Sequence, residues 1–574
     1  MCGIFALLNN DNLFQKKFIN DQFMKGQSRG PEFSNMQSYT LQCLLGFHRL
    51  AINGLNDLSN QPIIIGDTAV ICNGEIYNYK ELYELMGIKP KTQSDCEVII
   101  HLYKRYGIKQ TLQMLDGVFA FVLCEVNFND PISKIYVARD PYGVRPLYSL
   151  KQKTFQPDSR TPIYGFASEL KQLSEFSKEL PNHVVEQFKP GTYSKFTMKY
   201  QVSPKWELKK EQYLYHSTGF STVINETQYD IGCTLKNIQH YLCEAVKKRV
   251  LVTERPIACL LSGGLDSSLI TALVNENHKK NSDKPLETFS IGLEGSEDLK
   301  YARIVADYLG TNHTEILLTE QDFVDAIPEV ICAIESYDTT TVRASIGNYL
   351  LGKYISANSD AKVIFNGDGS DELCGGYLYM HAAPDAIEFD KECRRLLSDI
   401  HAFDVLRSDK CISCHGLEPR TPFLDRTLVQ YYLSIHPSLR FHKGNKQSEK
   451  FLLRMAFSEN NYLNSNGCAL LPKCVLFRTK EAFSDGVSKT TRSLYEIIQE
   501  KVVVLAASTE LFNVKYEHNT PDTDEKNYYR SIFESYYPGL GTIVPYFWMP
   551  RYVDAKDSSA RTLQIYNEVK TDIS

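Results

Sequence analysis

The sequence predicts two domains of different class, an α+β domain followed by a larger α/β domain. Three observations predict them. Over the first ~200 residues, short aromatic and β-branched runs are bounded by Gly, Asn, Asp and Pro, which is typical of strands joined by turns. From about residue 228, helical patterns alternate with compact apolar strands, as in a parallel sheet covered on both faces. The length of 574 residues also exceeds what one hydrophobic core serves and predicts two to four domains.

In the N-terminal region, strands are predicted at "AVICNGEIYN", "GVFAFVLCEV", "KIYVARDPYGVRPLYSL" and "PIYGFAS". The stretch from about 190 to 225 reads as a last hairpin that runs into a polar linker. Beyond it, "LKNIQHYLCEAVKKRVL" has helical periodicity, and "PIACLLS", "LETFSIG" and "KVIFNGDG" are compact apolar strands.

The stretch "PIACLLSGGLDSSLITALV" predicts a strand ending at Leu261, a glycine-rich turn, and a helix opening at Leu265–Asp266. Exposed backbone N–H groups and the positive end of a helix dipole would meet at this turn, where a phosphate or pyrophosphate could bind. Ser262 and Ser267 add hydroxyl donors, and Gly263 and Gly264 let the backbone approach a ligand closely. The turn is neither a Walker A loop, since no Gly-Lys-[Ser/Thr] follows, nor a dinucleotide fingerprint, since the glycine spacing differs.

The charge and composition of the chain argue against several classes of function. The net charge is −6, from 63 basic and 69 acidic side chains, which leaves no basic surplus for coating nucleic acid. No apolar run approaches the ~18 residues of a membrane span, and the N-terminus has no basic region of a secretory signal. We therefore expect a cytoplasmic protein, with neither nucleic acid nor membrane as a partner, whose 15 cysteines are reduced thiols.

The chain begins "MCGIFALLNN", and Cys2 has two interpretations. It is a small buried hydrophobe at the start of a strand. Alternatively, removal of Met1 leaves a thiol and a free α-amine on one residue, and the amine serves as base for the thiol nucleophile. The α-amine titrates near pH ~8 and the thiol near ~8.5, so the two groups are matched for that role.

Taken together, the motifs resemble those of the glutamine-dependent asparagine synthetases. "CGIF", "SRGPEFS", "HRLAI", "NGEIYN", "SDCEVI", "ARDPYGVRPLY", "SGGLDSS", "YDTTTVRAS", "GDGSDELCGGY", "EPRTPFLD", "KQSEKFLLR" and "TKEAFSDGV" follow the order of that family. The resemblance covers residues 2–500 well and thins toward the C-terminus. It implies an α/β/β/α-type sandwich glutaminase domain at 1–207 and a doubly wound parallel α/β adenylating domain with extra helices at 208–574.

The resemblance also implies an activity, in which asparagine is formed from aspartate and ATP with glutamine as the nitrogen donor. The product of ATP cleavage would be AMP plus pyrophosphate, through a β-aspartyl-AMP intermediate. Cys2 would be the glutaminase nucleophile, and the Asn73 side chain with the Gly74 N–H would form the oxyanion hole. The glutamine pocket would comprise Arg49 on the α-carboxylate, Asp95 on the α-ammonium, and Leu50, Ala51, Ile52, Asn53, Asn73, Gly74 and Glu75.

In the second domain the resemblance implies an ATP site with Mg²⁺ held by Asp266 and Asp371. Lys450 would neutralise charge on the phosphates, and Thr340 and Arg343 would contact aspartate or pyrophosphate. The nucleotide itself would contact Leu260, Ser262, Gly263, Gly264, Asp266, Ser267, Ser268, Ile291, Asn366 and Gly367. Ammonia would pass between the domains along a mainly apolar path, and a homodimer is compatible with the resemblance.

Two features depart from this picture. Asp368 stands where the family often has glutamate, so the carboxylate that orders the intermediate or assists attack by ammonia is one methylene shorter. "CISCH" at Cys411–His415 matches a haem-attachment pattern, but covalent haem requires export, and no second Cys/His pair stands at zinc-finger spacing.

Three alternatives stay open. Another cysteine-initiated amidotransferase could carry the same adenylating domain with a different acceptor carboxylate. A β-lactam synthetase would lack the N-terminal cysteine, so Cys2 counts against it. A non-catalytic relative would usually have lost one of the groups that are intact here, namely Cys2, Arg49, Asn73, Asp95, Asp266, Asp371 and Lys450.

Overall fold

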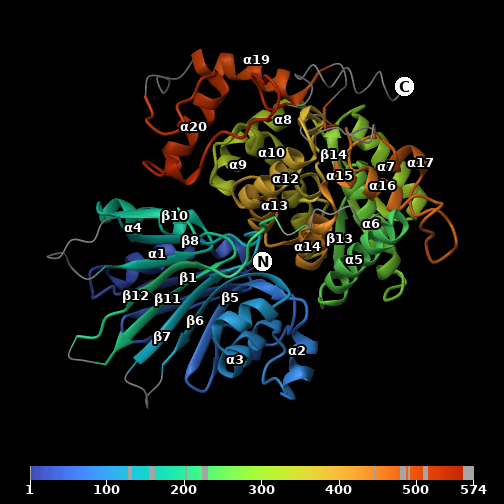
Figure 1. Cartoon of the computed structure of the whole chain (residues 1–574). Coiled ribbons are helices and arrows are strands. Elements are labelled where there is room, and N and C mark those ends of the chain that lie inside the picture. The colour runs from blue at the N-terminus through green and yellow to red at the C-terminus, as the bar shows by residue number, and fades with distance from the viewer. Residues whose placement is uncertain are drawn as a thin grey trace.

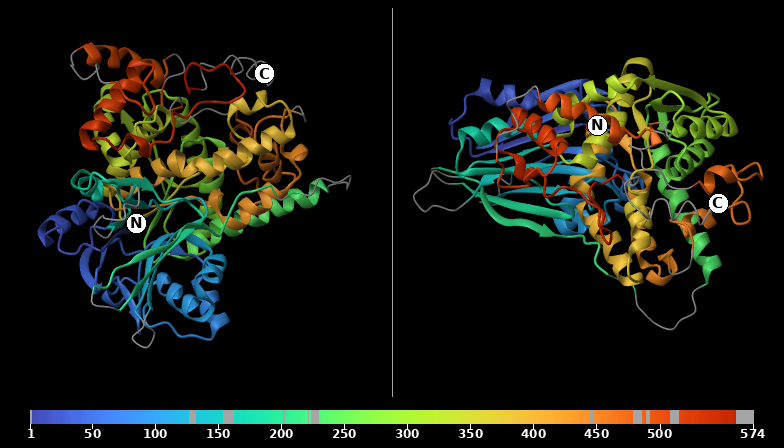
Figure 2. Two further views of the ribbon diagram at one scale, coloured as in Figure 1. Left: turned by 60° about the vertical axis from the view of Figure 1, so that its left-hand side comes forward. Right: turned by 90° about the horizontal axis from the view of Figure 1, so that it is seen from above.

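The computed structural model describes residues 2–126, 132–153, 162–200, 203–220, 222, 230–443, 447–478, 486–488, 492–507 and 515–559. The motif "TKEAFSDGV" therefore falls outside the described residues up to 485. Figure 1 shows two units, a β-rich one containing the N-terminus and a helix-rich one that follows it in the chain. Figure 2 shows the same division from two further directions. Within the described ranges, no helix is both long enough and apolar enough to cross a membrane.

The N-terminal unit is built on two six-stranded antiparallel sheets. The first has the order β10-β8-β9-β1-β3-β2 and the second β12-β11-β7-β6-β5-β4. The strands are β1 (Gly3–Leu8), β2 (Phe33–Thr40), β3 (Cys43–Arg49), β4 (Ile63–Ile65), β5 (Thr68–Ile76), β6 (Gly117–Glu125), β7 (Ile132–Arg139), β8 (Tyr148–Gln152), β9 (Tyr164–Ala167), β10 (His183–Gln187), β11 (Thr192–Lys199) and β12 (Glu207–Leu214).

These sheets pack face to face and are covered by helices on both outer faces. Ile4 and Ala6 of β1 share a core with Ile71 of β5 and Val122 of β6, so the inner faces meet. The alternate residues of β1 point outward and pack on α1 (Lys16–Met24). The outer face of β5 packs on α2 (Tyr79–Met86) and α3 (Val98–Met114). The predicted α/β/β/α sandwich is confirmed.

The last hairpin of this unit is also as predicted, since β11 and β12 pair antiparallel. However, β12 runs across the expected domain boundary at residue 207 and continues the second sheet to Leu214. Most of its residues are exposed and half of them are charged ("ELKKEQYL"), which makes it resemble a polar linker in sequence. We propose that the boundary lies between β12 and α5 (Ile231–Leu251).

The second unit contains a five-stranded, all-parallel sheet with the order β15-β14-β13-β16-β17. From β13 the chain adds β14 and β15 on one side of the sheet, and then β16 and β17 on the other side of β13. The predicted doubly wound parallel fold is confirmed, and ligands of such folds bind at the carboxyl end of the strand where the order reverses. The strands are β13 (Ile257–Leu260), β14 (Glu287–Leu293), β15 (Asn312–Leu318), β16 (Val363–Phe365) and β17 (Glu418–Arg420).

Helices cover both faces of this sheet, so its strands are apolar on both sides. Ile257 and Cys259 of β13 pack toward α5, α6 and α7, whereas Ala258 and Leu260 pack toward α9 and α10. The helices are α6 (Leu265–His278), α7 (Glu297–Leu309), α8 (Glu320–Asp325), α9 (Ile327–Ile334), α10 (Thr339–Asn358), α11 (Ser370–Cys374), α12 (Ala386–Asp399), α13 (Asp404–Ser413), α14 (Arg426–Ser434), α15 (Pro437–Arg440), α16 (Phe451–Ala456), α17 (Lys473–Leu476), α19 (Leu494–Ala507) and α20 (Asp524–Tyr536).

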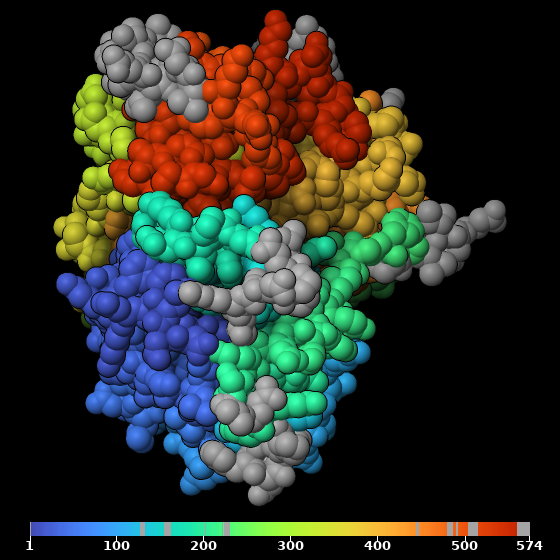
Figure 3. Space-filling model, turned by 90° about the vertical axis from the view of Figure 1, so that its left-hand side faces the viewer, coloured from blue at the N-terminus to red at the C-terminus, as the bar shows by residue number. Residues whose placement is uncertain are grey.

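The C-terminal part of the described chain lies against both units. In α20, Tyr529 and Phe533 pack in the same core as Ile327 of α9, and Ile543 packs in the same core as Val185 of β10. In Figure 3 this red segment lies directly on the blue-green part of the N-terminal unit. The C-terminal segment therefore covers the junction between the two units.

Candidate active sites

The first site lies at the start of β1, where the chain places Cys2 half-buried in the N-terminal unit. Its Sγ donates to the Leu50 carbonyl at 3.6 Å, and its own carbonyl accepts from Arg29 Nε at 3.0 Å. Burial raises the pKa of the Cys2 thiol to about 11, and the carboxylates of Glu75 and Glu418 act in the same direction. The resting thiol is therefore protonated at neutral pH, so a base must take its proton before it can attack.

Asn73 and Gly74 stand side by side on β5, next to the site. Asn73 is fully buried, its Nδ2 lies 3.4 Å from Ser168 Oγ, and the same hydroxyl accepts from the Ile4 N–H. Ser168 thus ties Asn73 to the strand that follows Cys2, a contact that the sequence did not predict.

The direction of the Gly74 N–H follows from the sheet register. Gly74 lies opposite Phe119 of β6. The Phe119 N–H donates to Asp140 Oδ2 at 3.3 Å, and the Phe119 carbonyl accepts from the Asp140 N–H at 2.7 Å, so both groups point away from β5. In an antiparallel pair of this kind, the N–H and C=O of the facing residue also point away from the partner strand. The Gly74 N–H therefore points to the side of β5 that β4 leaves uncovered, since β4 pairs only with residues 68–70.

The predicted glutamine-pocket loop follows β3. Asn53 Nδ2 donates to Glu75 Oε2 at 2.6 Å, which joins the loop to β5. Arg49 is buried and donates to the carbonyl of Gly54, to that of Asn56 at 2.9 Å, and to Asn60 Oδ1 at 2.7 Å. The guanidinium thus holds the loop itself in this structure, so an α-carboxylate would share Arg49 with those oxygens.

Asp95 lies beside this loop, in the short helix at Asp95–Glu97. Its Oδ2 accepts from the Ile76 N–H at 2.7 Å, and burial raises the pKa of the carboxyl to about 6. The cap of this helix is Ser94, whose hydroxyl accepts from the Cys96 N–H at 3.3 Å, so the Asp95 carboxylate is not used as a helix cap. A buried carboxylate near Glu75 is suited to holding an ammonium group.

The second site is a pocket at the carboxyl end of β13, where the strand order reverses. The predicted strand, turn and helix are confirmed, with the strand ending one residue early at Leu260 and α6 beginning at Leu265. Ser262 and Ser267 bond each other through their hydroxyls at 3.0 Å across the turn. Gly263 has a φ of +72°, and a Cβ there would approach the Ala302 nitrogen to 2.4 Å, so the turn requires glycine.

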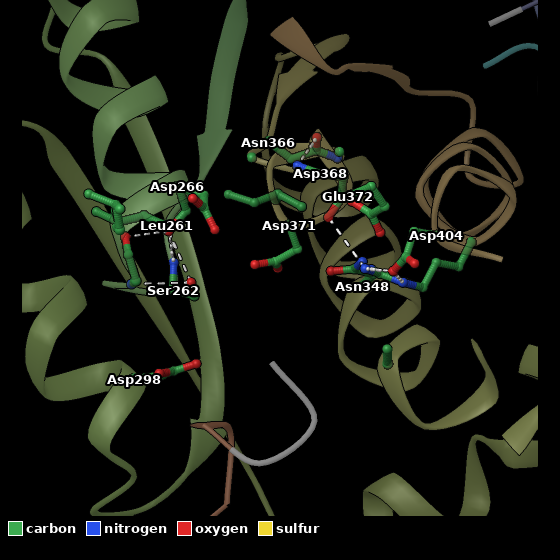
Figure 4. A pocket seen from close by; sticks show the side chains of 18 of the residues that line it. Leu261, Ser262, Asp266, Asp298, Asn348, Asn366, Asp368, Asp371, Glu372 and Asp404 are labelled. Carbon is green, nitrogen blue, oxygen red and sulfur yellow. Dashed lines mark hydrogen bonds and ion pairs between the residues drawn. The ribbon is translucent and has the colours of Figure 1, made fainter. Parts of the chain in front are cut away.

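Asp266 and Asp371 face each other from opposite walls of this pocket (Figure 4). Lys450 Nζ lies 2.6 Å from an oxygen of each carboxylate. The Lys450 side chain is almost fully buried and passes so close to Gly376 that a Cβ there would come within 1.9 Å of Lys450 Cε. The backbone of Lys450 has a φ of +58°, which is uncommon outside glycine. Its ammonium lies beside the turn at residues 261–264, between β13 and α6, which we call the phosphate-type turn.

The far wall of the pocket carries polar residues from α11 and α13 (Figure 4). Arg407 donates to Asp404 at 2.6 Å and lies 3.5 Å from Asp368. Tyr377 donates to Glu372 at 2.7 Å, and burial, with Asp404 nearby, raises the pKa of the Glu372 carboxyl well above its usual range. The sequence predicted only Asp368 of this group. Asp404 and Arg407 lie in "FDVLR", an ordinary amphipathic stretch with no recognisable motif.

The structure brings most of the predicted synthetase residues to the pocket. Its lining includes Leu260, Ser262, Gly264, Asp266, Ser267, Ile291, Thr340, Asn366, Gly367, Asp368, Asp371 and Lys450. Gly263 and Ser268 are not among the lining residues, since Gly263 turns against α7 and Ser268 is fully buried in α6. Asp298 and Arg478, which pair at 3.0 Å, are lining residues that the sequence did not predict.

Arg343 is not brought to the pocket. Its guanidinium pairs with Glu525 of α20 and with Asp557, at 2.5 and 2.8 Å, and is almost fully buried. It therefore fastens the C-terminal segment to α10, one turn beyond Thr340, which does line the pocket. Both partners lie far along the chain, where the family resemblance is weak.

The "CISCH" segment has a structural role. Cys411 lies on α13, where its thiol donates to the Ser345 carbonyl at 3.5 Å, and Cys414 bonds within the same turn. Across the described ranges, no three potential ligands among His, Cys, Asp and Glu gather in a group that could hold a metal ion.

Buried charges join the two sites across the interface between the units. Arg29 pairs with Glu169 and Asp409 at 2.7 Å each, and Lys410 pairs with Glu169 at 3.0 Å. Asp409 and Lys410 belong to α13, the helix whose first turns carry Asp404 and Arg407. One helix therefore contacts the N-terminal unit at one end and lines the second site at the other.

The two units match two known protein families. The profile of a glutamine amidotransferase domain matches residues 1–219, and that of asparagine synthase matches residues 237–388 and 382–537. The chain is 42% identical over 587 residues to the asparagine synthetase [glutamine-hydrolyzing] of Gallus gallus, covering 99% of each chain. It is 40% identical over 585 residues to that of Homo sapiens, again over 99% of each.

The fold and the matches thus define a class of protein in which a glutamine amidotransferase domain is joined to an asparagine synthase domain. Within that class, the chain belongs to the glutamine-hydrolysing asparagine synthetase family.

Proposed function

We propose that this chain forms asparagine from aspartate, glutamine, ATP and water, and releases glutamate, AMP and pyrophosphate. The observation that carries the proposal is the pairing of two sites on one chain. In one unit, Ser168 joins Asn73 to Ile4 of the strand that follows Cys2. In the other unit, Lys450, Asp266 and Asp371 meet beside the glycine-rich turn after β13. Neither site alone accounts for both halves of the reaction.

In the first half-reaction the Cys2 thiolate attacks the side-chain amide carbon of glutamine. The α-amine of Cys2, freed when Met1 is removed, takes the thiol proton, and the oxyanion accepts from Asn73 Nδ2 and the Gly74 N–H. Ammonia leaves, and water then hydrolyses the thioester to glutamate. Asp95 and Arg49 hold the ammonium and carboxylate groups of the substrate.

In the second half-reaction a side-chain oxygen of aspartate attacks the α-phosphorus of ATP and displaces pyrophosphate. The N–H groups at the start of α6 and the Lys450 ammonium face the phosphates and stabilise the charge that develops there. Ammonia then attacks the acyl carbon, and AMP leaves with one of the carboxylate oxygens. The apolar side chains of Leu260 and Ile291 line the same pocket and are suited to contact with the adenine ring.

Mg²⁺ fits the donor set of this pocket. Asp266 and Asp371 each have an oxygen within 2.6 Å of the same cation, Lys450, so the two carboxylates already converge on a shared positive charge. Mg²⁺ in such sites uses one or two carboxylates together with substrate phosphates, so a set of two suffices. When bound, the ion would neutralise phosphate charge, and these two carboxylates would hold it.

We further propose that the far wall binds the α-groups of aspartate. Its Arg407 faces the pocket opposite the phosphate-type turn, and Asp404 and Glu372 are carboxyl groups beside it. An amino acid with its α-carboxylate on Arg407 and its α-ammonium near those carboxyl groups would direct its side chain toward the phosphates. This arrangement assigns to Arg407 the role that the sequence assigned to Arg343.

Arg407→Leu should raise KM for aspartate by roughly tenfold or more, because a hydrogen bond between charged groups contributes about 1.5–3 kcal/mol. KM for ATP should change little. Steady-state pyrophosphate release at varied aspartate measures this effect, and Arg407→Lys, which keeps the charge, should be affected less. An unchanged KM for aspartate in Arg407→Leu would assign the α-carboxylate to another group.

Glutaminase activity should decrease in acid through Asp95. Its pKa is raised to about 6, so the carboxylate that binds the ammonium is present above that pH and is lost as the pH falls through it. We expect kcat/KM for glutamine, measured without ATP, to fall about tenfold per pH unit below pH 6 relative to Asp95→Asn. Taking the ratio of kcat/KM between the native enzyme and Asp95→Asn removes the contribution of Cys2 titration, which is the same in both. A ratio that stays constant from pH 5 to 7 would contradict the role of Asp95.

Pyrophosphate and asparagine formation with ATP, Mg²⁺ and aspartate, supplied with either glutamine or ammonia, tests the proposed function as a whole. Both donors should support synthesis. If glutamine is hydrolysed while neither donor yields asparagine, the acceptor is a carboxylate other than aspartate. If glutamine is not hydrolysed either, the chain is a non-catalytic relative.

A further inference from the structure

The loop of the glutamine site is bonded from outside by two residues of the other unit, Glu254 and Arg255. The Glu254 N–H donates to the Ile52 carbonyl at 3.0 Å, and its Oε1 accepts from the Gly54 N–H at 2.7 Å. Arg255 Nε donates to the Ala51 carbonyl at 2.7 Å. Three residues of the loop are thus held by two consecutive residues of the synthetase unit.

A third residue completes this arrangement. Glu32 of the N-terminal unit accepts from the Ala51 N–H at 2.7 Å and also pairs with Arg255 Nη2. Both backbone groups of Ala51 are therefore bonded within one Glu32–Arg255 pair. Because the Cys2 thiol bonds the adjacent Leu50 carbonyl, the position of this loop relative to the nucleophile depends on the pair.

The same two residues lead directly into the second site. Pro256 follows Arg255, its carbonyl accepts from the Lys362 N–H at 3.0 Å, and β13 begins at the next residue. Four residues later that strand ends at the phosphate-type turn. Leu50 and Ile52 also pack in the same apolar core as Val250, Val252 and Ile257. The loop is therefore anchored to the strand that carries the ATP site.

Neither side chain is needed for the interior of its own unit. Glu254 is exposed, and the Arg255 side chain is 27% exposed, so neither contributes much to the core. Within the described part of the chain, the hydrogen bonds and ion pairs of these two side chains go to the N-terminal unit, at Ala51, Gly54 and Glu32. Such contacts contribute little to stability at a surface, but they fix the geometry of the loop they touch.

We propose that Glu254 and Arg255 are positioning residues for the glutaminase reaction, supplied by the synthetase unit. They hold the backbone of residues 51–54 in the shape that binds glutamine, without touching the substrate. The inference rests on the proposed function, and it assigns part of the glutamine site to the unit that uses the ammonia.

The test compares Arg255→Ala, Glu254→Ala and Glu254→Gln in the full chain. Glutaminase kinetics are measured without ATP, and asparagine synthesis is measured with ammonia as donor. Arg255→Ala and Glu254→Ala should each raise KM for glutamine about tenfold, the scale of one lost charge-assisted hydrogen bond. Glu254→Gln keeps the oxygen that accepts from Gly54 and should stay within about twofold of native. Ammonia-dependent synthesis should be unchanged in all three.

Arg303→Ala is the matched control, since Arg303 pairs with Glu315 at 2.8 Å on the surface of α7, far along the chain from the loop. An unchanged KM for glutamine in Arg255→Ala and Glu254→Ala would overturn the inference. A parallel loss of ammonia-dependent synthesis would also overturn it, because it would mean that the residues support the fold as a whole. The native chain is assayed first, so failure of the proposed function shows there as absent synthesis with either donor.

Discussion

Lys450→Met should lower asparagine formation about 10²- to 10³-fold with either glutamine or ammonia as donor, the scale of removing one preorganised electrostatic group. The Lys450 ammonium lies 2.6 Å from both Asp266 and Asp371, in a buried position beside the phosphate-type turn. Because the Lys450 side chain is buried, water could not take over its role in stabilising the charge on the departing pyrophosphate. Because Cys2 lies in the other unit, glutamine hydrolysis without ATP should continue at the native rate.

Pyrophosphate release and glutamate formation, measured in parallel, check this prediction. Lys353→Met is the matched control, since Lys353 forms an exposed pair with Glu329 at 3.2 Å and lies away from the pocket. If Lys450→Met retained most of its synthesis, the charge at the turn would not act on the phosphates. If its glutaminase rate fell equally, the effect would be structural.

Cys2→Ala should abolish glutamine-dependent synthesis, to below about one thousandth of the native rate, since removing a covalent nucleophile costs at least that much in other enzymes. Ammonia-dependent synthesis should be unchanged, because the pocket at β13 contains no group from the N-terminal strand. Cys233→Ala, which alters an exposed thiol, is the control. Residual glutamine-dependent synthesis in Cys2→Ala would place the nucleophile elsewhere.

Met1 bears on the same experiment. The Cys2 thiol has its pKa raised to about 11, so it needs a base close at hand. The α-amine provides that base only when Met1 is absent. Mass determination of the N-terminus should therefore accompany the assay, and the specific glutaminase activity of a preparation should follow the fraction of chains that begin at Cys2.

Features set by local sequence were predictable. The turn after β13 uses glycine for a positive φ and serines for hydroxyls, and these residue types identify it without any structure. The two fold classes follow from short turn-bounded strands in one half and alternating helices and strands in the other. The α/β/β/α arrangement and most of the pocket residues came from the resemblance to the family.

Features set by distant partners were not predictable. Arg343 is a cation next to a predicted substrate-binding threonine, but its partners Glu525 and Asp557 lie about 200 residues away and remove it from the pocket. Arg407 shows the reverse case, because only the packing of α13 brings this helical arginine to the wall of the pocket. The bonds from Glu254 and Arg255 to residues 51–54 also arise only where the units meet.

In the proposed reaction, the second site joins aspartate to AMP before ammonia attacks. Aspartate labelled with ¹⁸O in its side-chain carboxylate, reacted with ATP, Mg²⁺ and glutamine, tests it most directly. The oxygen that attacks the α-phosphorus leaves with AMP, so mass spectrometry should find one ¹⁸O in AMP for each asparagine formed. AMP without label, or label in inorganic phosphate together with ADP, would rule out the aspartyl-AMP intermediate.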